Sequence, residues 1–321
     1  MRYRIVIGAV AVGSLVAGCG GGGTKNTSAH QSSPSRSHAA AALTEAQARA
    51  IFANYEKVNN EANAKVSDAL LRQNETGPML EVDLAGNKRI RAKQESKIKP
   101  FHYKSAQFFI PRDVSPAWFA AFAPVSSSDK EYVVFADTGG GKYKAATGSW
   151  LAKGQKFPSI ARGADGSATA VTTGPALGVG TRLSSYLSYV AARQKAPEGF
   201  APGPLTLKLG QRWAKDVYKI NSANRWRGRS EWAARTQPVY ALKTTDGGAL
   251  VLSPAVQALV YTAIQPHVWY QPPSDFYGLG PKRYYNRFRG EWLWTFATYV
   301  PPQGRASVVA SGVHAISATG S

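Results

Sequence analysis

The sequence predicts an α+β fold of two tandem domains, each with N-terminal helices packed on a curved antiparallel sheet. Three observations support this prediction. Apolar residues recur at helical spacing at the start of each half, within residues 44–71 and 181–190. Short runs rich in β-branched and aromatic residues follow in both halves. A stretch of Gly, Ala, Ser, Thr and Pro separates the halves. We therefore expect domains at residues 43–152 and 177–321, joined by a linker at 153–176.

The N-terminus has the pattern of a secretory signal. Arg2 and Arg4 precede thirteen apolar or small residues, which end in the string Val16-Ala17-Gly18-Cys19. Thirteen residues are fewer than the roughly 20 that a membrane-spanning helix needs. We assign residues 1–18 to a signal peptide and residues 19–42, which have almost no large apolar side chain, to a flexible tether.

Cys19 is the only cysteine in the chain. Its position resembles the lipobox of bacterial lipoproteins, in which the cysteine becomes the first mature residue and carries the lipid. The alternatives are an accidental cysteine in an ordinary cleavable signal, or one at the end of an uncleaved anchor. If Cys19 carries lipid, no cysteine remains for a disulfide or for a metal site.

The first half begins with two predicted helices. Thr44 and Gln47 match a capping box, and an apolar stripe follows from Ala48 to Val66. Ser67-Asp68 can start a second, short helix, which Gly77-Pro78 should end. We then expect about four strands, the last two joined by a glycine-rich turn: residues 106–110, 117–122, 131–136 and 143–151.

The second half should repeat this order. We expect Thr181 to cap a helix, and a further helix over residues 206–220, where Gly210 weakens the pattern. Asp246-Gly247-Gly248 predicts the turn of a hairpin over residues 239–252. A strand over 256–264 and a last hairpin over 291–300 and 306–316 complete the prediction. Alternation should place three aromatic residues of this hairpin toward the core: Trp292, Trp294 and Phe296.

The chain is strongly basic. It has 39 Lys and Arg against 19 Asp and Glu, a net charge of +20, or +18 without Arg2 and Arg4. For a protein tethered outside the cell, the nearest anions are phospholipid headgroups and phosphate-rich wall polymers. The alternative is that this charge serves only solubility. We expect no nucleic-acid partner, although extracellular nucleic-acid binding remains a weaker hypothesis, and protein partners are not predicted.

Three basic stretches contain the candidate anion-binding residues. The first stretch contains a single acid, Glu95. In the second and third stretches, basic residues alternate with aromatic or small residues, a mixture that suits phosphate binding and stacking. Gly228, in the second, could let a ligand approach the backbone. The same mixture also arises when aromatics face a core and arginines face water. The candidates are Lys88, Arg89, Arg91 and Lys93; Arg225, Arg227 and Arg229; and Arg283, Arg287 and Arg289.

Catalytic, cofactor and metal motifs are missing from the sequence. It has no Gly-x-Ser-x-Gly string, and no histidine spacing typical of a zinc site. Gly139-Gly140-Gly141-Lys142 lacks the spacing of a phosphate loop and should be a turn. We therefore predict no catalytic residue, no cofactor and no metal, and leave open an extracellular enzyme with a pocket in one domain. Five aromatics are candidates for the lining of such a pocket, with packing in the core as the alternative: Trp226, Trp232, Tyr261, Trp269 and Trp292.

Several strings resemble a family of uncharacterised actinobacterial lipoproteins. The resemblance rests on the lipobox, Leu43-Thr44-Glu45-Ala46, Trp118-Phe119, and the residues of 237–252, and it spans nearly the whole mature chain. It implies an extracytoplasmic, lipid-anchored location but no activity. The two halves are also similar to small α+β domains of the nuclear-transport-factor-like or cystatin-like type, whose sheet often wraps a pocket. We expect a membrane-anchored binding or structural protein of the cell envelope.

Overall fold

The structure, a computed structural model, describes residues 43–125, 129–235, 239–281 and 284–321. The signal peptide, Cys19, the tether and Arg283 lie outside these residues. The described chain has five α-helices and one nine-stranded antiparallel sheet, so the α+β class is confirmed. The sheet is continuous, with β1-β2-β3-β4-β9-β8-β7-β5 in spatial order and β6 paired with β7. Two tandem domains are not confirmed, and the boundaries near residues 152 and 177 stay a prediction.

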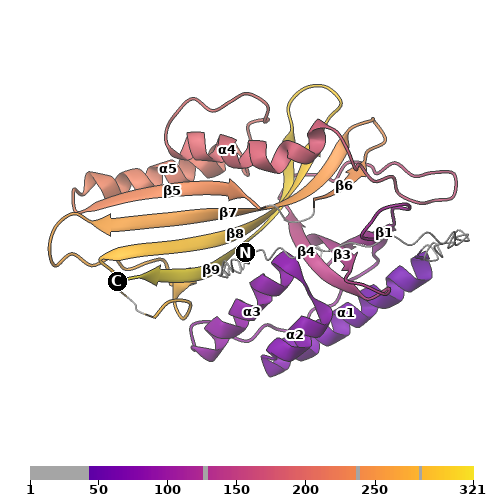
Figure 1. Ribbon diagram of the computed structural model, residues 1–321, viewed down its shortest axis with the longest axis horizontal. Coiled ribbons are helices and arrows are strands. Elements are labelled where there is room, and N and C mark those ends of the chain that lie inside the picture. Colours follow the sequence, from indigo (N-terminus) through magenta and orange to yellow (C-terminus); the bar gives the residue numbers. More distant parts are fainter. Residues whose placement is uncertain (1–42, 126–128, 236–238, 282–283) are drawn as a thin grey trace, which may run out of the picture.

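Three helices and four strands form the first half (Figure 1). The helices lie against the β1–β4 end of the sheet, where Phe52 and Tyr55 of the first helix pack against Phe135. The elements are α1 (Glu45–Lys65), α2 (Asp68–Asn74), α3 (Gly77–Arg91), β1 (Gln107–Phe109), β2 (Trp118–Pro124), β3 (Lys130–Asp137) and β4 (Tyr143–Leu151).

Two helices and five strands form the second half. Both helices lie against β5, and the first of them also packs on the long strands β7 and β8 (Figure 1). The predicted aromatics Trp292, Trp294 and Phe296 are buried, as expected. The elements are η1 (Pro175–Gly178), α4 (Val179–Ala191), α5 (Leu207–Ser222), β5 (Trp226–Ala234), β6 (Tyr240–Lys243), β7 (Ala249–Ala263), η2 (Ser274–Phe276), β8 (Arg287–Val300) and β9 (Ser307–Gly320).

Several local predictions are confirmed. The Thr44 side chain accepts a hydrogen bond from the Gln47 amide, and the Gln47 side chain accepts one from the Thr44 amide, so the capping box begins α1. The glycine-rich turn joins β3 to β4, with positive φ at Gly139, Gly140 and Gly141. The predicted hairpins β6–β7 and β8–β9 are also present.

The prediction for Gly77-Pro78 is wrong. These residues begin α3 and do not simply end α2, because proline lacks an amide hydrogen and fits the first helical turn, where that hydrogen has no partner. Residues 88–91, taken from the sequence only as a basic stretch, are the last turn of this helix. Cations are favoured there by the helix dipole.

Two further boundaries differ from the prediction. Helix α4 begins at Val179, after a 3₁₀ turn, so Thr181 lies inside the helix and does not cap it. Strand β7 runs without a break through Pro254, which the sequence suggested as a gap between two strands. Pro254 lies opposite the gap between the end of β5 and the start of β6. No strand in the described part of the chain pairs with it on that side, so the sheet loses no hydrogen bond through the amide hydrogen that proline lacks.

The sheet curls, and a segment outside it bonds both to β6 and to the residue that follows β1. This bridging segment, residues 155–171, bonds to β6 through the Ala161 amide and the Lys243 carbonyl (2.9 Å), and through the Lys243 amide and the Thr169 carbonyl (2.8 Å). Its Ala168 amide donates to the carbonyl of Ile110, just after β1 (3.1 Å). Most of the predicted linker is therefore packed along both edges of the sheet.

The halves of the sheet meet at a short ladder between β4 and β9. Only Trp150 with Ser311 and Leu151 with Ala310 pair there. The Thr295 hydroxyl of β8 reinforces this contact, donating to the Gly148 carbonyl (2.5 Å) and accepting from the Gly312 amide (3.2 Å). Thr295 is buried, so these two bonds have no water to replace them.

We predict that Thr295→Val lowers the free energy of unfolding by about 2–4 kcal/mol, because it leaves two buried backbone groups unpaired at roughly 1–3 kcal/mol each. Urea unfolding measures this change. Thr298→Val is the matched control, because the buried Thr298 hydroxyl has no hydrogen-bond partner among the described residues. The control should change stability by less than about 1 kcal/mol. Equal effects at the two positions would contradict the prediction.

Candidate functional site

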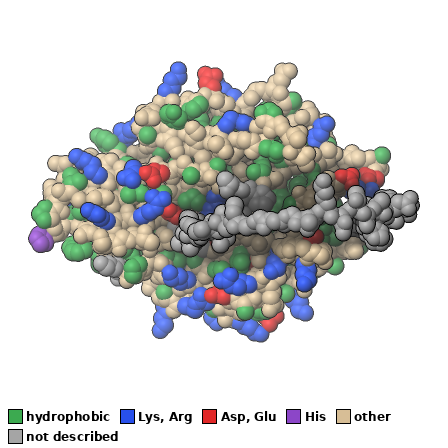
Figure 2. All heavy atoms as spheres, in the orientation of Figure 1, with side chains coloured by type: hydrophobic (Ala, Val, Ile, Leu, Met, Phe, Trp, Pro, Cys, Tyr) green, Lys and Arg blue, Asp and Glu red, His purple; other side chains and the backbone are tan. Residues whose placement is uncertain are grey.

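Four of the predicted arginines lie together on one exposed face of the sheet. Strand β7 separates β5 from β8, and its Thr262 pairs with both Arg227 and Arg287. In the next row, Val260 pairs with both Arg229 and Arg289. Residues that pair directly across a sheet share a face. We call these four residues the arginine face. Figure 2 shows basic side chains gathered over this part of the sheet.

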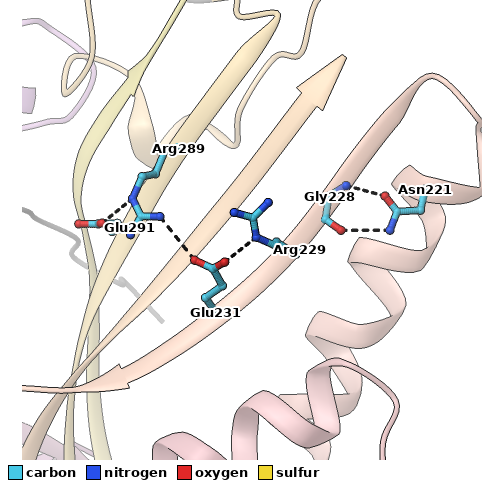
Figure 3. Close-up of polar contacts among 6 residues, drawn as sticks. All are labelled: Asn221, Gly228, Arg229, Glu231, Arg289 and Glu291. Atoms are coloured by element: carbon cyan, nitrogen blue, oxygen red, sulfur yellow. Dashed lines mark hydrogen bonds and ion pairs between the residues drawn. The ribbon is translucent and has the colours of Figure 1, made fainter. Parts of the chain in front are cut away.

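Two glutamates form ion pairs with two of the four arginines of the arginine face and leave the other two without an ion pair among the described residues. Arg229 Nε lies 2.5 Å from Glu231 Oε1, and Arg289 contacts both Glu231 (3.5 Å) and Glu291 (2.6 Å) (Figure 3). Arg227 and Arg287 make no ion pair with any described residue. Four cations therefore face two carboxylates, and the excess positive charge lies on the row formed by Arg227 and Arg287.

The pKa of Glu231 reflects its two arginine neighbours. The hydrogen bond from Arg229 holds this pKa below its ordinary value, against the opposing effect of partial burial, with a further contribution from Arg289. A depressed pKa keeps the carboxylate charged as the pH falls, so the pairing with Arg229 and Arg289 is present at neutral pH. It weakens only when the pH falls below the ordinary range of glutamate.

The α3 candidates do not form a common face. Lys88 donates to the Leu279 carbonyl (2.7 Å), the buried Arg89 lies 3.5 Å from Glu95, and Arg91 binds Asp68 through both guanidinium nitrogens. These contacts fasten α3 to neighbouring segments. Lys93 is exposed beyond the helix, as is Arg225 before β5. Anion binding by these residues stays a prediction.

Gly228 is held by the protein itself. Its amide donates to the Asn221 Oδ1 atom (2.6 Å), and its carbonyl accepts from Asn221 Nδ2 (3.0 Å), as Figure 3 shows. A Cβ atom at this position would lie 2.2 Å from Cε1 of Tyr261. Glycine at this position therefore makes room for the Tyr261 ring. The sequence had suggested that it makes room for a ligand.

A second polar cluster is buried under α1. Asn59 Nδ2 donates to Glu75 (2.5 Å) and lies 3.3 Å from Asp83. The Tyr103 hydroxyl donates to Glu131 (2.6 Å), and burial, followed by the charge of Glu131, raises the pKa of Tyr103. These residues join α1, α2 and α3 to β3 and are absent from the lining of the cavity described next.

A cavity of about 570 Å³ opens beside β1, β2 and β3, with Glu45 at the start of α1 among its lining residues. Gln107, Phe122 and Tyr132 form one row across β1, β2 and β3. Lys130 lies two residues before Tyr132 on the same strand face, and Phe109 lies two residues after Gln107. The alternation of these strands therefore brings their side chains to one lining.

The bridging segment forms the opposite wall. Phe157 stacks edge-on against Phe122, with ring centroids 4.4 Å apart, and lies 5.3 Å from the Tyr132 ring. Arg162 anchors this wall to β1 by donating to the Phe108 carbonyl (2.8 Å). Leu151, Ile160 and Leu250 add apolar surface. Aromatic and aliphatic side chains thus form part of the lining, together with polar residues from β1, β3 and the bridging segment.

The charged groups of the cavity are mostly cationic, and Gln107, Gln155 and Ser159 add neutral polar groups. Lys130, Lys156 and Arg162 line it together with one acid, Glu45, which is already paired with Arg49 (2.9 Å). Tyr132 is 1% exposed, and its hydroxyl has no hydrogen-bond partner within the described part of the chain. Burial raises the pKa of Tyr132 far above its ordinary value, so the hydroxyl stays a donor. A buried donor without a partner costs about 1–3 kcal/mol.

The aromatic residues proposed from the sequence do not line this cavity. Trp226, Trp232, Tyr261 and Trp292 are buried in the core of the second half, and Trp269 is 56% exposed. Sequence reasoning missed Tyr132 and Phe157. The alternation of Lys130, Tyr132 and Val134 could have indicated one strand face, but Phe157 lies in a segment without any period.

Neither a metal site nor a membrane-spanning helix is found in residues 43–321 outside the three gaps. No group of three His, Cys, Asp or Glu residues there is arranged to hold a metal ion. No helix there is long and apolar enough to cross a membrane.

Comparison with known proteins gives a family and one named relative. A family model described as a domain of unknown function, DUF8094, matches residues 39–320. The chain is 30% identical over 275 residues to the uncharacterized lipoprotein SCO6871 of Streptomyces coelicolor, an alignment that covers 77% of this chain and 74% of that protein. No solved structure matches the chain.

We predict that Gly228→Ala lowers the free energy of unfolding by at least about 2 kcal/mol, because the new methyl group overlaps the Tyr261 ring. Gly86→Ala is the control. A Cβ atom at Gly86 meets nothing within 4 Å, and alanine favours a helix interior by roughly 1 kcal/mol over glycine. Thermal or urea unfolding of both variants checks the prediction. A Gly228→Ala protein as stable as the wild type would overturn the packing role.

Proposed function

The chain belongs to the DUF8094 family, and on this premise we propose that it is a lipoprotein held by a lipid on Cys19 at the extracytoplasmic face of the cell membrane. The lipoprotein name of the Streptomyces relative supports this proposal. The basic start, the short apolar run and the cysteine after Val16-Ala17-Gly18 support it independently. The flexible tether would then give the folded part reach from the membrane.

The role of the folded part is binding without catalysis, at an anionic envelope surface. One observation carries this part of the proposal: Arg227 and Arg287 lie side by side across β7 and make no ion pair with the described residues. Guanidinium groups bind phosphate in bidentate geometry. Headgroups and phosphate-rich wall polymers are the anions nearest to a tethered protein.

The arginine face would also complete the attachment. A single acyl chain gives only marginal membrane binding, and stable anchoring usually takes two signals. A basic surface adds about 1 kcal/mol per cation near an anionic membrane. With two of the four arginines offset by Glu231 and Glu291, about 2 kcal/mol remains for this second signal.

The experiment tests the two signals in one series of full-length proteins. Wild-type protein grown with a clickable fatty acid should carry the label, and Cys19→Ala should not. The purified Cys19→Ala protein should sediment with vesicles that contain anionic phospholipid. Changing Arg227, Arg229, Arg287 and Arg289 to glutamine changes the local charge from +2 to −2. The loss of the two uncompensated cations alone should weaken this binding roughly thirtyfold at low salt, the equivalent of about 2 kcal/mol. The two glutamates left without partners should weaken it further.

The control removes the same charge from elsewhere on the surface. Glutamine replaces four exposed lysines that form no ion pair within the described chain: Lys142, Lys153, Lys208 and Lys215. This protein should bind vesicles almost as well as its parent, and high salt should remove the difference. Label on Cys19→Ala would contradict the lipid anchor, and equal binding by both quadruple variants would contradict the arginine face.

A further inference from the structure

We propose that the anionic surface bound by the arginine face is a phospholipid bilayer, into which the neighbouring end of the sheet inserts Trp269 and Tyr284. This inference rests on the proposed function and narrows it to one anion. It starts from three large apolar side chains that the fold leaves exposed: Ile264 (41%), Trp269 (56%) and Tyr284 (48%). We call these three residues the apolar tip.

The exposure of the apolar tip is concentrated in one short segment. Single exposed apolar residues are common on soluble proteins and need no explanation. In the described chain, however, three of the seven exposed large hydrophobic residues lie within residues 264–284. The rings of Trp269 and Tyr284 stack on no other described aromatic ring. Their positions are therefore not explained by packing within the described chain.

The backbone places the tip at the end of the sheet where β7 ends and β8 begins. The Ile264 amide donates to the Arg225 carbonyl (3.0 Å), just beyond the last residue pair of β5 and β7. The Ala263 amide donates to the carbonyl of Asn286, the residue before β8 (2.8 Å). Ile264 therefore lies between the start of β5 and the start of β8.

The two aromatic residues of the tip face outward because their neighbours face the core. Tyr270 and Tyr285 exchange two backbone hydrogen bonds (2.6 and 2.9 Å), and both rings pack on Phe288, with centroids 5.3 and 5.2 Å away. Side chains alternate in direction along an extended segment. The residues directly before this pair, Trp269 and Tyr284, accordingly lie on its solvent side, as their exposure shows.

Unpaired cations border the apolar tip. Arg227 and Arg287 form the row of the arginine face next to this end, and Arg225 is exposed beside Ile264. None of these three arginines makes an ion pair with a described residue. Residues 264–286 contain a single acid, Asp275, so little negative charge opposes an anionic surface. Figure 2 shows hydrophobic and basic side chains together at this end of the molecule.

This combination selects a bilayer over a dissolved polymer. Tryptophan and tyrosine favour the membrane interface, where the ring is buried and its polar group stays hydrated. Binding to such a surface grows with the apolar area buried and with the attraction between cations and anionic lipids. A phosphate-rich polymer in water would satisfy the arginines, but it has no apolar interior in which the two rings could be buried.

The test compares variants of the full chain carrying Cys19→Ala, so that no lipid contributes to binding. The vesicles contain equal amounts of phosphatidylglycerol and phosphatidylcholine. Trp269→Ala combined with Tyr284→Ala should weaken cosedimentation at least about tenfold, because two rings no longer bury apolar surface. The control Tyr189→Ala removes an exposed ring from α4 and should leave binding unchanged. Thermal unfolding confirms that each variant is folded.

A second measurement reports insertion directly. Vesicles with brominated acyl chains quench the fluorescence of tryptophans that enter the bilayer. The chain has eight tryptophans, and we expect the quenching to disappear in Trp269→Phe, which keeps an apolar ring and should still bind. Inorganic polyphosphate serves as the dissolved polyanion. The double alanine variant should bind it as tightly as the parent protein does, whereas the quadruple arginine variant should bind it more weakly.

Three results would overturn the proposal: the double alanine variant binds vesicles as tightly as its parent, Trp269→Phe leaves the quenching unchanged, or the double variant loses polyphosphate binding to the same extent. If the double variant does not fold, the quenching decides. Weaker vesicle binding by the arginine variant alone would retain the arginine face and reject insertion. Weaker vesicle binding by the double alanine variant alone would retain insertion and reject the arginine face.

Discussion

The short junction between β4 and β9, with the two hydrogen bonds of the buried Thr295 hydroxyl, is the connection on which the continuity of the sheet depends. Strands β4 and β9 share only two residue pairs. The Thr295 hydroxyl supplements them by bonding to Gly148 and Gly312, and the Ser149 hydroxyl donates to the Thr295 carbonyl (3.2 Å). A Cβ atom on Gly312 would lie 2.7 Å from the Thr295 oxygen, which explains glycine at that position. Other strand pairs of this sheet are joined by longer ladders. Here the close approach of small residues and the hydrogen bonds of one threonine supplement a ladder of two residue pairs.

Both candidate surfaces follow from this continuous sheet. Strand β7 brings Arg227 and Arg287, sixty residues apart in the sequence, into one row. The curl brings β1 close enough to β6 for the bridging segment to bond to both. The cavity lies beneath that segment, and the arginine face lies at the other end of the sheet. Lipid anchoring and anion binding are thus proposed for two separate parts of one molecule.

Sequence patterns predicted the elements whose signals are local. The capping box at Thr44, the Asp246 turn and the alternation from Trp292 to Phe296 each depend on nearby residues. Elements whose formation depends on tertiary contacts were missed. One is α3, which begins at Gly77, and the other is β5, whose arginines were interpreted as a candidate ligand site. The arginine candidates were named from the sequence, but their proximity was not. The cavity was not predicted either, because Phe157 has no local signal and reaches Tyr132 only through the packing of residues 155–171 on β6.

The most direct test of this account is hydrogen exchange measured by mass spectrometry at increasing urea concentrations, with peptides from β2–β3 and from β7–β8 followed together. If the two halves share one sheet and one bridging segment, both sets of peptides should lose protection at the same urea midpoint, and residues 155–171 should lose it no earlier than the edge strands. Two separate midpoints, with early exchange throughout residues 153–176, would show two independent domains joined by a linker and would contradict the account.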